Sequence, residues 1–207
     1  MLAVEWLLIG GGGHGLSVAD VVRRAGGKVV AVVDPRPDLS WQIPVELSLR
    51  DALRWFDSDG GRVIVSLGDC ATRGRLSGEL VAGGLELGTV LASTATISAD
   101  VGRGSVVMEH AHVGPRAVVS EGVIVNTAAV VEHDCEVGAF SHVAPGAVLL
   151  GGVRVGPGTL IGAGAVVLPG VVVGARAVVG AGSVITSNVP DGWRIVGNPG
   201  RRTLRGE

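Results

Sequence analysis

The sequence predicts a small α/β domain over residues 1–90, followed by a β-helix of about five coils over residues 91–207. Three observations predict this arrangement. Aliphatic residues recur at every sixth position in the second half of the chain, short apolar strands alternate with helices in the first half, and the composition is unusual. The chain has 35 Gly among 207 residues but only 4 Trp, 2 Phe and no Tyr, whereas average usage gives about 7% Gly. A core so poor in large side chains requires a regular stack of small and branched residues.

The six-residue repeat begins at Val101 and runs to Ile185. Each of its fifteen leading positions is Val, Leu or Ile, and the fourth position after each is Ala, Ser, Thr, Cys or Val. A period of six excludes an amphipathic helix, whose period is about 3.6 residues, and it fits a short strand followed by a bend. Three repeats close one triangular coil of 18 residues, so residue n is expected beside residue n + 18, with the aliphatic side chains stacked inside.

Alternating elements precede the repeat, which indicates a small α/β domain. Ser48 and Asp51 form an S-x-x-D helix start, and this helix is expected to run to about Trp55. The other expected elements are strands at Glu5–Ile9, Lys28–Val33 and Arg62–Ser66 and a helix at Gly15–Ala25.

A glycine-rich turn, Gly10–Gly15, joins the first strand to the first helix and satisfies the pattern G-x-G-x-x-G. Asp34 ends the second strand at about the spacing of the acidic residue in dinucleotide-binding folds, so the domain is Rossmann-like. The second half of such a fold does not fit into about 90 residues, which argues against an NAD site. Two interpretations remain. The glycines form only a tight turn, or the N–H groups at the helix N-terminus bind a diphosphate, with His14 as a further donor.

The net charge and the cysteines limit which binding partners and which cellular compartment are expected. The formal charge is −2 and the pI is about 6.2, which argues against nucleic acid and against a basic membrane-binding surface. Cys70 and Cys135 lie far apart without C-x-x-C spacing, so neither a disulfide framework nor a thiolate metal site is expected. Met1–Ile9 are apolar without a basic leader, and we expect neither export nor membrane spanning. A cytoplasmic protein is therefore expected.

His133 is the candidate base in the repeat. It takes the third place of its repeat unit, at a corner, so its side chain is expected to project outward. A neutral imidazole suits a general base near pH 7, and Asp134 is placed to orient it. Gly151 follows one coil later, where its missing side chain leaves room for a thioester and its N–H can stabilise an oxyanion. The alternative is that His133 is only a solvated corner residue.

Two segments and the order of the motifs resemble a known family. Asn126–Cys135 is similar to its motif N-T-x-A-x-(V/I)-E-H-(D/E)-C, and Phe140–Ala147 is similar to its continuation F-S-H-V-x-P-G-A. The glycine turn, an aspartate after the second strand and Ser66–Asp69 precede them in the family's order, and a terminal V-P…G-N-P follows. The chain therefore resembles the bacterial hexapeptide-repeat sugar O/N-acyltransferases of the PglD and NeuD type.

The resemblance implies a left-handed parallel β-helix that forms a homotrimer, with acetyl-CoA between neighbouring prisms and a nucleotide-linked sugar on the N-terminal domain. The catalytic residues that it implies are His133, Asp134 and Gly151. The implied contacts to the sugar nucleotide are Gly13, His14, Gly15, Asp34, Gly68, Asp69 and Asn126, and those to acyl-CoA are His142, Gly151, Ala163, Ala181 and Asn198. Cys70 replaces an asparagine that is common in the family, which leaves the nucleotide base open.

The leading prediction is an acetyl-CoA-dependent acyltransferase that N-acetylates a nucleotide-linked amino sugar by direct transfer, with no metal. O-acetylation of a sugar or of sialic acid is the alternative within this class. A zinc hydratase of the γ-carbonic anhydrase type shares such coils, but its H-x-x-x-x-H pair is missing because His133 and His142 are nine positions apart. The third class is a sugar-nucleotide-binding protein without catalysis, which predicts binding and no release of CoA.

Overall fold

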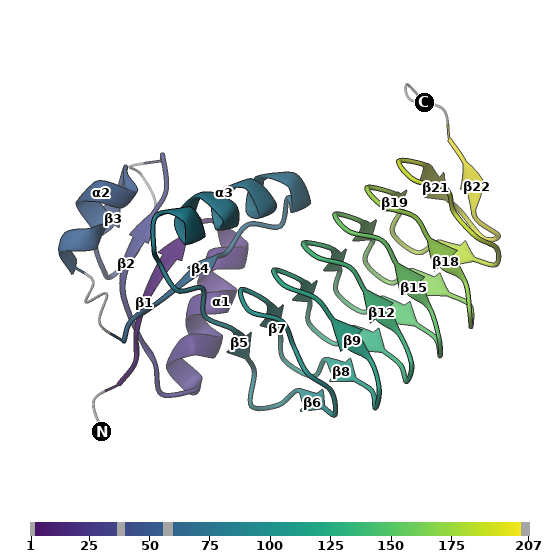
Figure 1. Cartoon of the computed structure of the whole chain (residues 1–207), viewed down its shortest axis with the longest axis horizontal. Helices are drawn as coiled ribbons and strands as arrows, with labels where there is room; N and C mark the ends of the chain where they lie inside the picture. The colour runs from purple at the N-terminus through teal and green to yellow at the C-terminus, as the bar shows by residue number, and fades with distance from the viewer. Residues whose placement is uncertain (1–2, 37–39, 56–59, 204–207) are drawn as a thin grey trace.

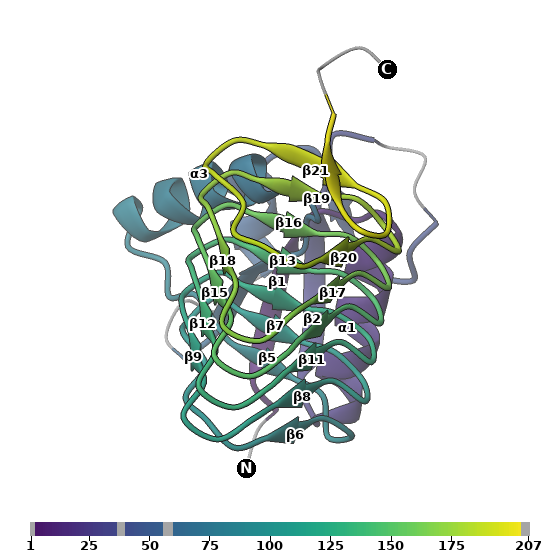
Figure 2. The ribbon, with the colours of Figure 1, turned by 90° about the vertical axis from the view of Figure 1, so that its right-hand side faces the viewer.

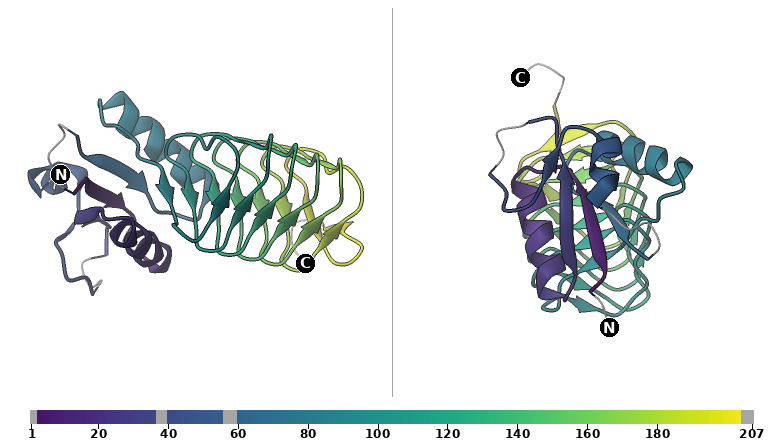
Figure 3. Two further views of the ribbon diagram at one scale, coloured as in Figure 1. Left: turned by 90° about the horizontal axis from the view of Figure 1, so that it is seen from below. Right: turned by 90° about the vertical axis from the view of Figure 1, so that its left-hand side faces the viewer.

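The computed structural model describes residues 3–36, 40–55 and 60–203. Its N-terminal domain is a four-stranded parallel sheet in the order β3-β2-β1-β4, with helices on both faces (Figures 1 and 3). The strands are β1 Glu5–Ile9, β2 Lys28–Val33, β3 Val45–Glu46 and β4 Arg62–Val65; the helices are α1 Gly13–Arg24, α2 Leu49–Ala52, which continues as the 3₁₀-helix η1 Leu53–Trp55, and α3 Cys70–Ala82.

The elements predicted for this domain are confirmed, with differences of one or two residues at their ends. The first helix begins at Gly13, inside the glycine turn, and β4 ends at Val65. Ser48 caps α2 by accepting a hydrogen bond from the N–H of Asp51 at 3.2 Å, as the S-x-x-D pattern predicts. The two-residue strand β3 and the glycine-containing helix α3 have patterns too weak to be predicted from the sequence.

From Val90 onward the chain winds into a parallel β-helix with three walls, each named by its first strand (Figure 2). The β5 sheet holds β5 Val90–Leu91, β7 Val106–Val107, β10 Ile124–Val125, β13 His142–Val143, β16 Leu160–Ile161, β19 Val178–Val179, β21 Arg194–Val196 and the antiparallel β22 Arg201–Arg202. The β6 sheet holds β6 Thr96–Ile97, β8 His112–Val113, β11 Val130–Val131, β14 Val148–Leu149, β17 Val166–Val167 and β20 Val184–Ile185. The β9 sheet holds β9 Val118–Val119, β12 Glu136–Val137, β15 Arg154–Val155 and β18 Val172–Val173.

The β-helix has about six coils, one more than the repeat predicts. In the regular part residue n pairs with n + 18, as Ile124 does with His142. The first coil is two residues shorter, because Val90 pairs with Val106 and Thr96 pairs with His112. The first coil therefore does not continue the six-residue spacing back from Val101, and the spacing does not reveal it in the sequence.

The predicted interior ladder is confirmed. All of its members from Val107 onward are buried, whereas Val101 at its start is partly buried; one stack consists of Val107, Val125, Val143, Ile161 and Val179. Small residues fill the corners beside the ladder, so the prism has a dense core without aromatic side chains. No helix in the described part of the chain has the length and apolar character needed to cross a membrane.

The two domains share buried residues. Successive side chains of β1 point to opposite faces of the sheet, so Leu8 packs with Val18 of α1 while Leu7 packs on the side of α2 and α3. Helix α1 also contacts β5, and Val106 and Met108 of the β-helix belong to the same buried cluster as Leu8. This common core holds the N-terminal domain against the first coils (Figure 1).

Candidate active site

His133 stands at the corner between β11 and β12, on the edge where the β6 and β9 sheets meet. Its side chain is 56% exposed, and its Nδ1 lies 2.7 Å from Asp134 Oδ2. Asp134 has a φ of +61°, a left-handed conformation that turns the corner. Because the carboxylate only accepts, the Nδ1–H of the imidazole donates to it, and Nε2 keeps a lone pair for an incoming group.

Gly151 lies one coil beyond His133 on the same edge, where the N–H of Gly152 donates to the His133 carbonyl at 3.0 Å. A Cβ on Gly151 would lie 2.6 Å from His133 Cε1 and 2.7 Å from Nε2. The absence of a side chain at Gly151 therefore makes room for the imidazole of His133. The sequence predicts instead that it leaves open space for a thioester. The N–H of Gly151 donates to no acceptor within the described residues.

Arg116 lies one coil before Asp134 and donates two hydrogen bonds to its carboxylate, from Nε to Oδ1 at 2.6 Å and from Nη2 to Oδ2 at 2.7 Å. These bonds, followed by the one from His133, hold the pKa of Asp134 well below its usual value. Asp134 is therefore ionised at neutral pH. Sequence reasoning missed Arg116, although counting 18 residues back from Asp134 leads to it.

Asp34 holds the glycine turn and is 2% exposed. The N–H of Gly11 donates to Asp34 Oδ2, and Arg36 donates from Nε to Oδ1 and from Nη2 to Oδ2, all at 2.8 Å. These bonds, with that of Arg36 the strongest, hold the pKa of Asp34 far below its usual value. The sequence predicts a substrate contact for Asp34, whereas both of its oxygens are engaged within the turn. The structure brings Arg36 to the turn instead, with Nη2 3.1 Å from a Cβ built on Gly12.

The glycines at the start of α1 have different tasks. A side chain on Gly13 would meet open space, whereas one on Gly15 would collide with the Gly10 carbonyl. Gly15 is buried and allows the helix to pack against the turn, and its contact with substrate stays a prediction. No side chain caps α1 at Gly12, which leaves the positive end of the helix dipole for an anion.

His142 lies where the N-terminal domain meets the β-helix. Asn126 Oδ1 accepts from the N–H of Thr127 at 2.8 Å, which turns its Nδ2 toward His142 Nε2 at 3.1 Å. His142 Nδ1 lies 3.2 Å from the carbonyl of Gly68 and therefore carries the proton. Both ring nitrogens are engaged, so His142 does not serve as a second base. The sequence predicts it beside acyl-CoA, and within the chain it faces Gly68 of the N-terminal domain.

His14 approaches His142, with 6.4 Å between the ring centroids. Burial, and then the charge of Arg73, lower the pKa of each histidine to about 4. Both are therefore neutral at pH 7. His14 Nε2 is buried and has no hydrogen-bond partner among the described residues, and a buried polar atom of this kind calls for a partner from a ligand or from water.

Arg73 of α3 joins the two domains and is 1% exposed. All five of its N–H groups donate to backbone carbonyls: Nε to Gly122, Nη1 to Leu67 and Gly68, and Nη2 to Phe140 and Ser141. Burial lowers the pKa of this guanidinium. An arginine in a helix of mixed composition gives no signal of such a role, so the sequence analysis misses it.

The remaining predicted residues lie apart from these contacts. Asp69 caps α3, and its Oδ1 accepts from a helix N–H at 2.8 Å. Ala163 and Ala181 are exposed on the edge between the β5 and β6 sheets, where the N–H of Gly182 donates to the Ala163 carbonyl at 2.8 Å. Asn198 is exposed in the turn between β21 and β22.

One chain therefore carries two groups of candidate residues. His133, with Asp134 and Gly151, stands on the edge between the β6 and β9 sheets, whereas His14 and His142 meet at the domain junction on the β5 sheet. Within one prism the β6 and β9 sheets lie between the edge that carries His133 and the β5 sheet (Figure 2). In the described parts of the chain, no three His, Cys, Asp or Glu side chains gather in a way that would hold a metal ion.

Two family models match the chain. The model described as "PglD N-terminal domain" matches residues 6–80, and the model described as "Bacterial transferase hexapeptide (six repeats)" matches residues 152–187. The two matches fall on the α/β domain and on the β-helix, respectively.

Several solved structures resemble the chain along nearly its whole length. The acetyltransferase domain of PglB from Neisseria gonorrhoeae FA1090 has 35% identity and a TM-score of 0.89, covers 96% of this chain and is itself covered to 99%. The same domain is also solved in complex with acetyl coenzyme A. PerB from Caulobacter crescentus, solved with CoA and GDP-perosamine, has 33% identity, a TM-score of 0.90 and 97% coverage of each chain. WeeI from Acinetobacter baumannii AYE has 25% identity, a TM-score of 0.88 and coverage of 98% and 100%.

Proposed function

This chain belongs to the hexapeptide-repeat sugar acyltransferases of the PglD and NeuD type, and we propose that it transfers the acetyl group of acetyl-CoA to the amino group of a nucleotide-linked sugar. Its fold is the left-handed parallel β-helix of this family, and it is an acetyl-CoA-dependent acyltransferase that acts on a sugar. The finer assignment, to an amino group on a nucleotide-linked sugar, is supported by the similarity to PerB, whose complex holds CoA and GDP-perosamine.

The observation that carries the proposal is the pairing of His133 with Asp134 beside Gly151. His133 Nε2 takes a proton from the amine as the amine nitrogen attacks the thioester carbonyl and the C–N bond forms. The N–H of Gly151 donates to the oxyanion that develops on this carbonyl. The C–S bond then breaks, and the departing CoA thiolate takes the proton from the imidazolium. Asp134 orients the ring and stabilises the imidazolium while it exists.

The nucleotide is proposed to bind at the glycine turn. The uncapped start of α1 and the open backbone at Gly13 offer N–H donors to a diphosphate, and the guanidinium of Arg36 adds positive charge beside Gly12. The unpartnered Nε2 of His14 and the amide of Asn126 supply polar contacts at the domain junction. This arrangement orients the sugar away from the turn and toward the β-helix.

The proposal includes a homotrimer, because the two groups of candidate residues are separated within one chain. The β6 sheet, one of the two walls between them, presents a column of valines on its outer side, each only partly buried: Val130, Val148, Val166 and Val184. A continuous apolar column of this kind is favourable when another chain covers it. Contact along this sheet brings the His133 edge of one copy next to the domain junction of another.

The proposed function is tested by mixing the protein and acetyl-CoA with UDP-, dTDP- and GDP-linked amino sugars and following free thiol. We expect release of CoA with one of them, and a product that keeps its acetyl group in neutral hydroxylamine, as an amide does and an ester does not. An ester product would instead indicate O-acetylation. Tight binding of a sugar nucleotide with no thiol released would identify a binding protein and refute the transferase assignment.

The role of His133 is tested with His133→Ala. We expect the turnover number to fall by about two to four orders of magnitude, the range for a positioned base, with an unchanged melting temperature because the side chain is exposed. His110→Ala, at another exposed corner with a φ of +58°, is the control and should retain activity. Full activity in His133→Ala would remove the base from the mechanism.

A further inference from the structure

Among the described residues, three ion pairs join neighbouring coils on the outside of the β-helix, each between residues n and n + 18. Two of them make a single contact: Arg103–Glu121 at 3.4 Å and Arg154–Glu136 at 3.3 Å. The third, Arg116–Asp134, makes two contacts, at 2.6 and 2.7 Å. A guanidinium that binds both oxygens fixes the plane of a carboxylate, which a single long contact does not do.

The backbone conformation at this corner also distinguishes the Arg116–Asp134 pair from the other two ion pairs. The stacked positions are Arg116, Asp134, Gly152 and Gly170, with φ values of +58°, +61°, +70° and +70°. Left-handed backbone is unfavourable for residues with a Cβ, and the later coils use glycine at this place. Arg116 and Asp134 therefore occupy positions that favour glycine, and they are the two whose side chains meet beside His133.

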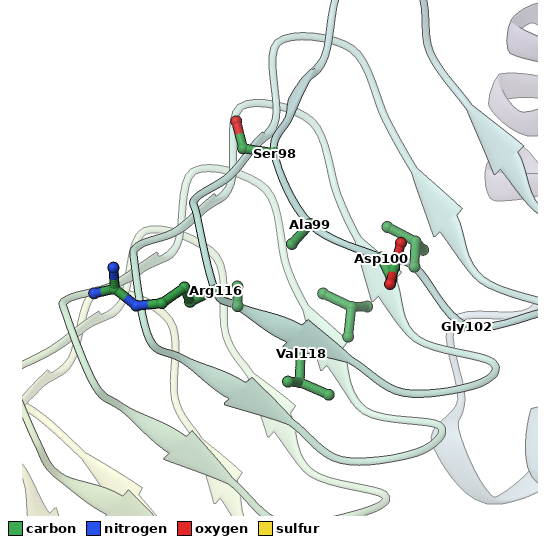
Figure 4. A pocket seen from close by; sticks show the side chains of 9 residues that line it. Ser98, Ala99, Asp100, Gly102, Arg116 and Val118 are labelled. Carbon is green, nitrogen blue, oxygen red and sulfur yellow. The ribbon is translucent and has the colours of Figure 1, made fainter.

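The Arg116 side chain extends toward Asp134 and away from Asp100, the other nearby carboxylate. Arg116 borders a cleft of about 520 Å³ whose lining includes Asp100. Figure 4 shows its guanidinium directed away from Asp100 and from the interior of the cleft. It extends instead along the outside of the corner to Asp134, which contacts the imidazole of His133 through the same Oδ2 that accepts from Arg116 Nη2.

We propose that Arg116 is a positioning residue for the acyl transfer: it fixes the Asp134 carboxylate, and through it the orientation of the His133 imidazole. The inference rests on the proposed role of His133 as base. Because Arg116 balances the charge of Asp134, the carboxylate orients the ring without an unopposed negative charge that would favour the imidazolium. Removing Arg116 leaves that charge unopposed beside the ring.

The charged surroundings of His133 are few, which makes this effect measurable. The coil before presents Gly114, Pro115 and Arg116 at the corner, and the coil after presents Leu150, Gly151 and Gly152. Beside Asp134 and Arg116, the neighbouring titratable group is Glu132, which directly precedes His133 in the chain. Changing Arg116 therefore alters the balance of charge at the imidazole directly.

The test compares Arg116→Met, Arg116→Lys and the control Arg103→Met, which breaks another coil-to-coil ion pair. For Arg116→Met we expect kcat to fall by about 10- to 100-fold, as for outer partners that orient a functional imidazole, with an unchanged melting temperature. The acidic limb of its profile of kcat/KM against pH should move to higher pH. Arg116→Lys retains the charge and one contact and should be intermediate, and Arg103→Met should match the wild type.

A double variant separates this proposal from the proposed function. If Arg116→Met adds less than about a twofold loss to the residual turnover of His133→Ala, Arg116 acts through His133. Wild-type kcat and pH profile in Arg116→Met overturn the inference while leaving the base in place, as does a rise in the KM for acetyl-CoA alone, which indicates a ligand contact. Should Arg116→Met melt early, Arg116→Lys carries the same comparison. Full activity of His133→Ala overturns both proposals.

Discussion

The imidazole of His133 lies in the space that a side chain at position 151 would take, one coil further along the same edge. A Cβ on Gly151 would stand 2.6 Å from Cε1 and 2.7 Å from Nε2, closer than packed atoms approach. The lack of a side chain at Gly151 therefore permits this position of the ring, while the hydrogen bond from Nδ1 to Asp134 fixes the orientation of the ring. The two contacts together leave one position for Nε2, the atom proposed to take the proton.

Gly151→Ala is expected to displace the imidazole without unfolding the coil, because the exposed ring can swing outward. A displacement of about 1 Å at a reacting group costs on the order of 100-fold in rate, and we expect a loss of that size in kcat. Steady-state kinetics and thermal melting measure the two effects. Gly78→Ala, in α3 with open space around its Cα, is the matched control and should keep full activity. Unchanged kcat in Gly151→Ala would show that the position of the ring is not critical.

Arg73→Met should lower the free energy of unfolding by about 3 kcal/mol or more, because it removes five hydrogen bonds to buried and partly buried backbone carbonyls at the domain junction. Arg75→Met in the same helix removes an exposed ion pair with Glu79 and should cost less than about 0.5 kcal/mol. Urea unfolding of the two variants measures the difference. Equal stability of the two would mean that the domain junction does not depend on the Arg73 guanidinium.

The protein should become less stable as the pH falls from about 6.5 to about 4. The pKa of His14 and of His142 is lowered from 6.5 to about 4 in the folded protein. Within this window the unfolded chain binds protons that the folded chain does not, so the free energy of unfolding decreases as the pH falls and this loss is complete below about pH 4. Asp34, Asp69 and Asp134, whose pKa values are lowered, act below that window.

The comparison that isolates this effect is the melting temperature of the wild type and of His142→Asn at several pH values from 7 to 4. The variant has one histidine fewer to protonate on unfolding, so its melting temperature should depend less steeply on pH. Identical slopes would show that burial of His142 does not disfavour its charged form.

Asp69→Ala should destabilise the protein by about 1 kcal/mol through loss of the N-cap of α3. Asp69→Asn should retain most of the stability, because asparagine also caps helices. The midpoint of urea unfolding measures both. A higher KM for the sugar nucleotide in the stable Asp69→Asn variant would add the substrate contact that the sequence resemblance implies, whereas equal stability of Asp69→Ala and wild type would remove the capping role.

The regular part of the fold follows from the amino-acid pattern alone. A six-residue period specifies which side chains point inward and which residue follows one coil later, because each coil repeats the same local geometry. The same rule predicts that His133 and Gly151, which are 18 residues apart, lie on one edge. The six-residue period does not predict the first coil, because that coil is two residues shorter and its residues fall outside the regular spacing.

The irregular contacts, in contrast, depend on how the whole chain packs. The five bonds of Arg73 and the contact of His14 with His142 join residues from different elements, with no fixed spacing between them. Nothing in a local pattern specifies such pairs, because they depend on how the α/β domain docks on the prism. Periodic backbone geometry is encoded locally, whereas the partners of a buried polar group are chosen by packing across the whole chain.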